Sequence, residues 1–128
     1  MTGKKSGKTV LVIEDGKDIR QFAVTVLRLE GYQTLEAPDA EAGLQLFREQ
    51  PVDLVLLDLR LPGRDGWWLL SEKKRIPGKG EVPVIVFTAS ADPQHRKRAT
   101  ETGAADYLVK PVSAGMLRDA VASILPAE

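Results

Sequence analysis

Four short apolar segments recur along the chain, and in none of them do polar residues alternate with apolar ones. They occupy residues 10–13, 54–57, 84–87 and 107–109. Unbroken apolar segments of this length are typical of strands that are covered on both faces, as they are in a parallel sheet. Residues 33–36 instead alternate polar and apolar side chains, so we expect this further strand at an edge of the sheet.

The segments between these strands have apolar residues at helical spacing. The first predicted helix ends before Gly31, and its apolar stripe comprises Ile19, Phe22, Ala23, Val26 and Leu27. Asp39 and Ser113 are placed to cap the second and the last helix. The third helix is expected over roughly residues 66–75, and the fourth, which is polar, over roughly residues 92–102. This alternation of strands and helices predicts an α/β three-layer sandwich with right-handed crossovers.

Composition excludes several classes of protein. The 128 residues suffice for one domain, and 43% of them are hydrophobic and 28% charged. Because 18 basic residues balance 18 acidic ones, we expect no direct nucleic-acid binding. The absence of cysteine and the presence of one histidine exclude a disulfide scaffold and a zinc site built from these residues. No apolar segment reaches the length of a membrane span, so we expect a cytoplasmic protein with a disordered tail at residues 1–8 and one domain at residues 9–126.

Charged and polar residues stand at the ends of the predicted strands. Glu14 and Asp15 follow the first strand, Asp58 the third and Lys110 the last, while Thr88 ends the fourth. In a parallel sheet these side chains gather at one edge, where ligands of such folds bind. At an effective dielectric constant of about 20, two carboxylates ~4 Å apart repel each other by about 4 kcal/mol. A hard divalent cation relieves that repulsion, and an all-oxygen set of ligands suits Mg²⁺.

Asp58 is the central carboxylate of this set and is the candidate nucleophile. A carboxylate that attacks phosphorus forms an acyl phosphate. Lys110 offers a positive charge and Thr88 a hydroxyl group to an incoming phosphoryl group. Transfer of that group depends mainly on positioning and charge neutralisation.

Four stretches of the chain resemble the receiver domain of two-component response regulators. They are residues 10–15 (VLVIED), 53–66 (DLVLLDLRLPGRDG), 84–89 (VIVFTA) and 103–111 (GAADYLVKP). Each is a weak signal alone, but all of them in this order on separate strands are specific, and the likeness covers about residues 9–125. The resemblance implies a flavodoxin-like fold with five parallel strands in the order 2-1-3-4-5.

The resemblance also implies a phosphoryl-acceptor site with bound Mg²⁺. By position, Asp58 matches the family's phospho-accepting aspartate. Asp15 would be the more direct metal ligand, Glu14 would act through water, and the backbone carbonyl of Arg60 would complete the protein ligands. These roles are carried over from the family.

Three further roles follow from the same resemblance. Thr88 matches the hydroxyl residue that turns toward the phosphoryl oxygens, and Lys110 matches the family's ammonium group. Tyr107 lies where the family places an aromatic side chain that moves with the threonine, and a core or half-buried strand tyrosine is nearly as good an interpretation. The bond between Lys110 and Pro111 is commonly cis at this position, since an X-Pro bond adopts that form at low cost.

The function implied by the resemblance is a phosphorylation-dependent signalling switch. A sensor histidine kinase or a histidine phosphotransfer protein would donate the phosphoryl group to Asp58. The surface of the fourth helix, last strand and last helix would then be remodelled toward a downstream protein target. We expect no turnover of an external substrate and no membrane association. The chain would be a stand-alone receiver or a piece of a larger regulator or hybrid kinase.

Two other functions stay open at this point. A haloacid-dehalogenase-type phosphatase also uses a nucleophilic aspartate, but it needs a second aspartate where this chain has Arg60. A pseudo-receiver that never accepts phosphate usually lacks one of the acidic pair, the acceptor aspartate or the lysine, and all of these are present. Arg60 also stands where the family controls the access of water, so we hypothesise that it alters the lifetime of the acyl phosphate.

Three side chains outside this set carry separate expectations. Because Trp67 and Trp68 are adjacent, we expect one in the core and the other exposed as an anchor for a partner. His95 stands beside basic residues 96–98 and is interpreted as a solvated surface residue.

Overall fold

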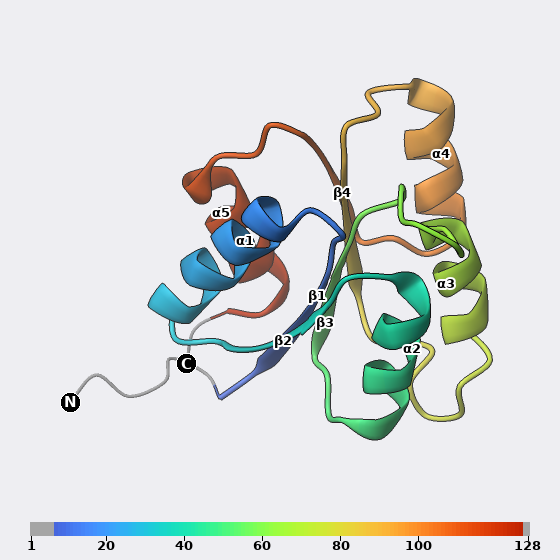
Figure 1. Cartoon of the computed structure of the whole chain (residues 1–128), viewed down its shortest axis with the longest axis horizontal. Helices are drawn as coiled ribbons and strands as arrows, with labels where there is room; N and C mark the ends of the chain where they lie inside the picture. Colours follow the sequence, from blue (N-terminus) through green and yellow to red (C-terminus); the bar gives the residue numbers. More distant parts are fainter. Residues whose placement is uncertain (1–6, 127–128) are drawn as a thin grey trace.

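The computed structural model describes residues 7–126. Within them, five parallel strands form a sheet in the order β2-β1-β3-β4-β5 (Figure 1). The strands are β1 (Thr9–Ile13), β2 (Gln33–Ala37), β3 (Leu54–Leu57), β4 (Val84–Thr88) and β5 (Asp106–Val109). The predicted parallel arrangement, the strand order and the position of β2 at an edge are confirmed. Residues 1–6 of the expected tail lie outside the described residues, and the domain limits 9–126 stay a prediction.

Helices cover both faces of this sheet. They are α1 (Lys17–Leu29), α2 (Ala40–Glu49), α3 (Gly66–Lys73), α4 (Pro93–Glu101) and α5 (Ala114–Ile124). Figure 1 shows α1 and α5 on one face and α2, α3 and α4 on the other, which confirms the three-layer sandwich. The predicted caps are also confirmed, because Asp39 accepts a hydrogen bond from the Ala42 amide and Ser113 one from the Met116 amide. None of the helices within residues 7–126 is long and apolar enough to cross a membrane.

The central strands are apolar without interruption because each face packs against helices. In β1, Leu11 and Ile13 belong to a core cluster shared with α2 and α3. Val10 and Val12 of the same strand belong to a second cluster shared with α1 and α5. All of these side chains are 0% exposed. Burial of such a side chain contributes about 1.5–3 kcal/mol to folding, so the sheet has little freedom to bend at the site described below.

Two predictions about exposure are wrong. β5 is the second edge of the sheet, and Tyr107 is its only buried residue. It lacks polar alternation because Leu108 and Val109 each pack partly against the core on opposite faces. In α1, Ile19 and Phe22 are 40% and 39% exposed. Helical spacing shows which residues lie on one face of α1. It does not show whether another element covers that face near the start of the helix.

Two stacked cations help to attach the helix α4 to the domain. Ala99 is its only buried residue. The guanidinium carbon of Arg96 lies 4.9 Å from the centre of the Tyr107 ring, and that of Arg98 lies 4.1 Å from the centre of the Trp67 ring. Cations at these distances are attracted to the ring faces. The polar sequence of α4 therefore reflects a helix that lies on aromatic rings more than on aliphatic side chains.

The expectations for the tryptophans and the histidine are also wrong. Trp67 and Trp68 are both half-buried, and both pack against the same core cluster. Arg64 covers the ring of Trp68 at 5.2 Å. His95 is half-buried as well, because its Nδ1 lies 2.6 Å from the Ser90 hydroxyl oxygen and its ring meets Trp67 edge-on. These side chains are covered by residues from other elements, which spacing along one helix cannot show.

Candidate functional site

The parallel sheet places the predicted site residues at one edge. Each strand end is held by backbone hydrogen bonds that continue beyond the strand. The amide of Asp58 donates to the carbonyl of Ile13 at 3.1 Å, and the amide of Lys110 donates to the carbonyl of Thr88 at 2.8 Å. The amide of Glu14 donates to the carbonyl of Ala37 at 3.0 Å. Glu14, Asp58 and Lys110 therefore extend from backbone that is as well fixed as the strands themselves.

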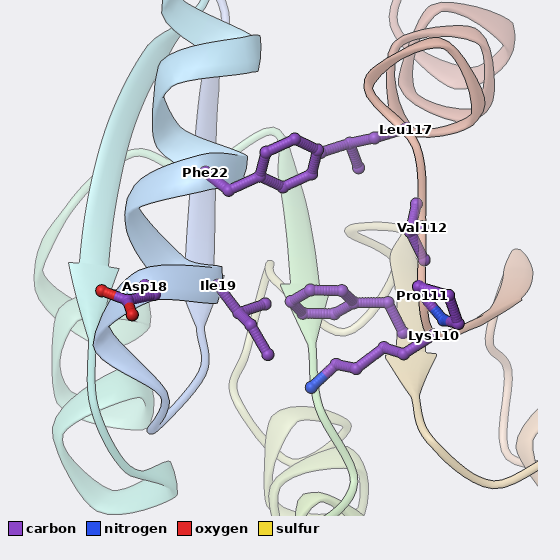
Figure 2. A pocket seen from close by; sticks show the side chains of 8 residues that line it. Asp18, Ile19, Phe22, Lys110, Pro111, Val112 and Leu117 are labelled. Atoms are coloured by element: carbon purple, nitrogen blue, oxygen red, sulfur yellow. The ribbon is translucent and has the colours of Figure 1, made fainter.

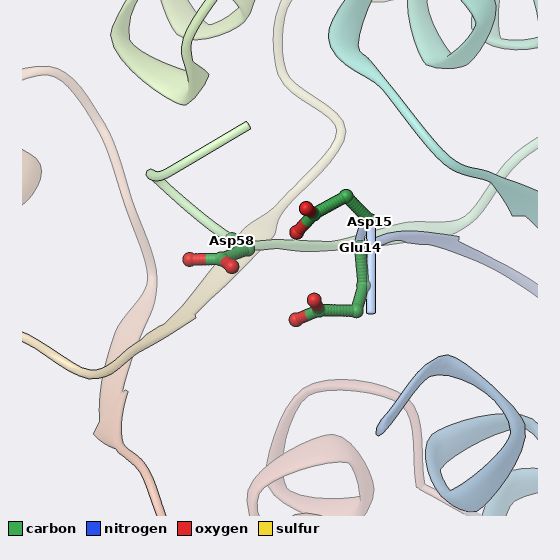
Figure 3. A group of neighbouring side chains, drawn as sticks. All are labelled: Glu14, Asp15 and Asp58. Carbon is green, nitrogen blue, oxygen red and sulfur yellow. The ribbon is translucent and has the colours of Figure 1, made fainter. Parts of the chain in front are cut away.

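Three carboxylates meet at this edge, as predicted. One oxygen from each of Glu14, Asp15 and Asp58 lies within 4.8 Å of the others. Figure 3 shows the three carboxylates directed to the same side of the chain, two from the segment after β1 and one from the segment after β3. Glu14 and Asp58 are 2% and 4% exposed, whereas Asp15 is exposed. The cluster thus has a buried part and a part that is open to solvent.

Lys110 occupies the buried part of the cluster. Its Nζ lies 2.5 Å from Oε1 of Glu14 and 3.0 Å from Oδ2 of Asp58. Burial lowers the pKa of Lys110, but hydrogen bonds and charges from both carboxylates outweigh burial and raise the pKa above its usual value. Burial, together with the charge of Asp58, raises the pKa of Glu14 despite its hydrogen bonds to Lys110 and Gly16. The pKa values of Lys110 and Glu14 are both raised because one ammonium group faces two buried carboxylates. The lysine gains two negative partners, whereas each carboxylate has only a share of one positive charge.

Asp58 is oriented through both of its carboxylate oxygens. The backbone amide of Arg60 donates to Oδ1 at 3.1 Å, and Lys110 donates to Oδ2. Behind it, a Cβ atom added at Gly66 would lie 2.8 Å from the Asp58 carbonyl oxygen. Only glycine lets α3 begin this close to the strand end. The carboxylate of Asp58 is therefore held at both oxygens, and its backbone lies directly against the start of α3.

The open part of the site is a cavity of about 520 Å³. Asp15, Arg60 and Thr88 line it, together with Trp67, Ser90 and His95. The Thr88 hydroxyl is buried and has no hydrogen-bond partner among the described residues. A buried hydroxyl without a partner costs about 1–3 kcal/mol, which makes it a group available to an entering ligand. Asp15 makes no hydrogen bond through its carboxylate within the part of the chain that the structure describes.

These residues fit a hard divalent cation. The donors are all oxygens, and three carboxylates face a single ammonium group, so the cluster retains excess negative charge when ionised. Asp15 offers an exposed carboxylate, and the Arg60 backbone lies next to Asp58. Such a donor set suits Mg²⁺, which keeps several waters and uses one or two carboxylates.

Several contacts of this site were not predicted. Lys110 binds Glu14 as well as Asp58, and Tyr107 donates a hydrogen bond from its hydroxyl group to the Ser90 carbonyl at 2.8 Å. Arg20 of α1 donates from Nη1 to the carbonyl of Glu14 at 2.9 Å. No sequence signal distinguishes such an arginine from one exposed to solvent. The peptide bond between Lys110 and Pro111 is cis, as the resemblance implied.

An apolar cavity of about 500 Å³ lies beside Lys110 (Figure 2). Ile19 and Phe22 of α1 form one wall of it, and Pro111 and Val112 of the segment after β5 form another. The stem of Lys110 lines the same cavity. The exposed part of the α1 stripe is thus next to the charged site.

Comparison with known proteins gives consistent matches. The family model of the response regulator receiver domain matches residues 10–122. The probable transcriptional regulator ycf27 of Porphyridium aerugineum is 37% identical over 116 residues, which are 91% of this chain and 47% of that protein. The phosphate regulon transcriptional regulatory protein PhoB of Escherichia coli K12 is 38% identical over 106 residues, or 83% of this chain and 46% of that protein. The chain therefore spans just under half the length of these relatives.

Solved structures match along nearly their whole length. A putative response regulator from Chloroflexus aurantiacus J-10-fl has a TM-score of 0.88 and 31% identity, covering 94% of this chain and 98% of that one. A CheY-like receiver domain protein from Methanospirillum hungatei JF-1 has a TM-score of 0.85 and 26% identity, covering 92% and 93%. Receiver domains are signalling switches and not metabolic enzymes, and they generally bind Mg²⁺. The chain belongs to the response regulator receiver family of two-component systems.

Proposed function

We propose that Asp58 accepts a phosphoryl group from a phosphohistidine of a partner kinase or phosphotransfer protein, with Mg²⁺ bound by Asp15, Asp58 and the Arg60 carbonyl and through water by Glu14. The observation that carries this proposal is the setting of Asp58. Its carboxylate is held at both oxygens, by the Arg60 amide and by Lys110, next to two further carboxylates.

The transfer replaces one bond to phosphorus by another. An oxygen of Asp58 forms the new O–P bond while the N–P bond of the donor phosphohistidine breaks, and the imidazole leaves with its electron pair. Bound Mg²⁺ supplies charge neutralisation to the phosphoryl oxygens. Lys110, whose ammonium group lies 3.0 Å from Oδ2 of Asp58, is near enough to stabilise the negative charge on the oxygens of the incoming phosphoryl group.

Phosphorylation changes the contacts around Asp58 and so drives the switch. The Thr88 hydroxyl is buried and has no hydrogen-bond partner within residues 7–126, so it is free to donate to an oxygen of a phosphoryl group on Asp58. Tyr107 is linked to the same loop, because its hydroxyl group donates to the carbonyl of Ser90, two residues after Thr88. Movement of this loop therefore reaches Tyr107 in β5 and the Arg96 side chain stacked on it. The surface of α4, β5 and α5 then presents a new face to a downstream protein.

The donor protein docks on the apolar cavity beside Lys110. Ile19 and Phe22 are 40% and 39% exposed, and they form a contiguous apolar surface with Pro111 and Val112 across the cavity. The cavity reaches the stem of Lys110, whose ammonium group contacts Asp58. An apolar helix of the donor lying here would bring its phosphohistidine to Asp58.

Phosphorylation at Asp58 is tested by intact-protein mass spectrometry after incubation with acetyl phosphate and Mg²⁺. We expect the mass of one phosphoryl group to be gained by the wild type and not by Asp58→Asn. No gain by the wild type would favour a pseudo-receiver that acts as a scaffold. Continuous release of phosphate from an added phosphate ester would favour the phosphatase instead.

Docking is tested with a purified phosphotransfer protein that phosphorylates the wild type. We expect Phe22→Ala to slow transfer from this protein while leaving the reaction with acetyl phosphate unchanged. Leu29→Ser is the matched control, because Leu29 is 77% exposed on the same helix but does not line the cavity. Equal slowing by both variants would contradict this docking surface.

A further inference from the structure

We propose that Arg20 is a positioning residue, which orients the Asp15 carboxylate for the divalent cation by holding the peptide group between Glu14 and Asp15. This inference rests on the proposed function, because it concerns the same cation site. Arg20 lies in the first turns of α1, and its Nη1 donates to the carbonyl oxygen of Glu14 at 2.9 Å. Its Nε donates to Oε1 of Glu36 in β2 at 3.2 Å.

The carbonyl of Glu14 matters because it belongs to the peptide plane that leads into Asp15. The amide and the side chain of Glu14 are already bound, the first by Ala37 and the second by Lys110 and the Gly16 amide. Asp15 has no such contact of its own through its carboxylate within the described residues. The direction of its side chain therefore depends on the backbone that precedes it, and Arg20 fixes that backbone.

Arg20 is itself rigidly held. Its side chain is 16% exposed, and its planar guanidinium group donates in two directions, to a backbone carbonyl and to Glu36. Gln21 also donates to Oε1 of Glu36, at 3.2 Å, which restrains the carboxylate that holds Arg20. The arginine thus connects the segment after β1 to both α1 and β2. Removal of a residue that orients a metal-binding side chain commonly weakens metal affinity by about 10–100-fold.

A purely structural role for Arg20 is the competing explanation, and the chain contains a matched control for it. Arg28 of the same helix donates from Nε to the hydroxyl group of Thr34 in β2 at 2.9 Å. It joins the same two elements at their other end, away from the acidic cluster. If Arg20 served only to attach α1 to β2, Arg20→Ala and Arg28→Ala would act alike.

The experiment titrates Mg²⁺ alone into the metal-free proteins and follows tryptophan fluorescence, since Trp67 lines the same cavity as Asp15. We expect Arg20→Ala to weaken Mg²⁺ binding by about tenfold and Arg28→Ala to leave it unchanged. In the metal-free proteins, we also expect amide hydrogen exchange at Asp15 and Gly16 to be faster in Arg20→Ala than in the wild type. Glu36→Ala, which leaves the arginine but removes its second partner, should weaken binding in the same direction and by less.

The outcomes separate this inference from the proposed function. Wild-type affinity in Arg20→Ala, or in Glu36→Ala if the first variant does not fold, would overturn the positioning role and leave the phosphoryl-acceptor site intact. Equal losses in Arg20→Ala and Arg28→Ala would overturn it as well. Failure of the wild type itself to bind Mg²⁺ at millimolar concentration would overturn the proposed function and this inference together.

Discussion

Buried or half-buried lysines stand at both ends of the sheet, and they have different partners. At the carboxyl edge, Lys110 binds the carboxylates of Glu14 and Asp58. At the opposite end, Lys73 donates to the carbonyl of Gly80 at 2.6 Å. Lys79 donates to three backbone carbonyls at the end of α2, those of residues 47, 48 and 50, at 2.6, 3.0 and 3.0 Å. One end pairs its cation with groups that can change charge, and the other pairs its cations with groups that cannot.

The pKa values follow this difference. Carboxylate partners raise the pKa of Lys110, whereas burial lowers the pKa of Lys73, which has a neutral carbonyl as its hydrogen-bond partner. A phosphoryl group on Asp58 would change the charge that faces Lys110, whereas the hydrogen-bond partners of Lys73 and Lys79 are backbone carbonyls, which do not titrate. On the proposed function, the same residue type serves signalling at one end and attaches loops and helix ends at the other.

The largest expected effect comes from removing the cation at the carboxyl edge. We expect Lys110→Met to slow phosphorylation by acetyl phosphate about 100-fold or more, because the oxygens of the transferred phosphoryl group lose a cation that stabilises their charge. Mg²⁺ binding should not weaken, since a cation that competes for Glu14 and Asp58 is gone. Both quantities can be measured on the same preparation, by mass spectrometry and by fluorescence titration. Parallel loss of phosphorylation and of Mg²⁺ binding would mean that Lys110 only maintains the structure.

Removing a cation at the opposite end should have the reverse pattern. We expect Lys79→Met to lower the free energy of unfolding by about 1–3 kcal/mol, because carbonyls at the end of α2 lose a charged donor. The rate of phosphorylation should stay at the wild-type value. Urea unfolding and the acetyl phosphate reaction test the two parts, and a slower reaction would contradict the separation of the two ends.

Thr88, at the carboxyl edge of the sheet, gives a prediction in which a substitution raises the free energy of unfolding instead of lowering it. We expect Thr88→Val to raise the free energy of unfolding by about 1 kcal/mol, since it replaces a buried hydroxyl without a partner by a methyl group of similar size. The variant should still accept the phosphoryl group but should not transmit the change to Tyr107. Urea unfolding gives the first result, and the Tyr107 ring signals in NMR spectra before and after phosphorylation give the second. A destabilised variant would indicate that Thr88 has a partner, such as a bound water.

The smallest effects are expected in the pH dependence of stability. Because the pKa of Lys110 is raised on folding, its contribution is complete below 10.5 and is lost as the pH rises through the higher folded value. Because the pKa of Lys73 is lowered on folding, burial of its charge opposes folding at neutral pH, and this cost disappears as the pH approaches 10.5. As the pH rises, the free energy of unfolding of the wild type should therefore fall relative to that of Lys110→Met. Over the same pH range it should rise relative to that of Lys73→Met. Urea unfolding from neutral pH to above 10.5 checks both signs.

Most of the fold and the residues at the strand ends could be predicted from the sequence. Residues 10–13 and 54–57 are apolar on both faces, which only a covered parallel strand requires, and Asp39 and Ser113 cap their helices as local rules demand. Once the strands are parallel, their ends must meet, so the gathering of the carboxylates with Lys110 followed from topology.

The contacts made by long side chains could not be predicted. Arg20, Lys79 and His95 each reach a partner on another element through several rotatable bonds. Nothing in the spacing of their own helix or loop specifies that partner. The exposure of Ile19 and Phe22 was missed for a related reason, because it depends on how the start of α1 lies relative to the segment after β5.

The way in which α4 is attached has a consequence for the cost of moving it. Interlocked aliphatic side chains resist sliding, because any shift opens a void. A guanidinium group above a ring, as in Arg96 over Tyr107 and Arg98 over Trp67, can travel across a flat surface and keep much of its attraction. Each such stack is worth only about 0.5–1 kcal/mol at an exposed site. The helix α4 can therefore slide along these two rings at a lower cost than a helix that is held by interlocked aliphatic side chains.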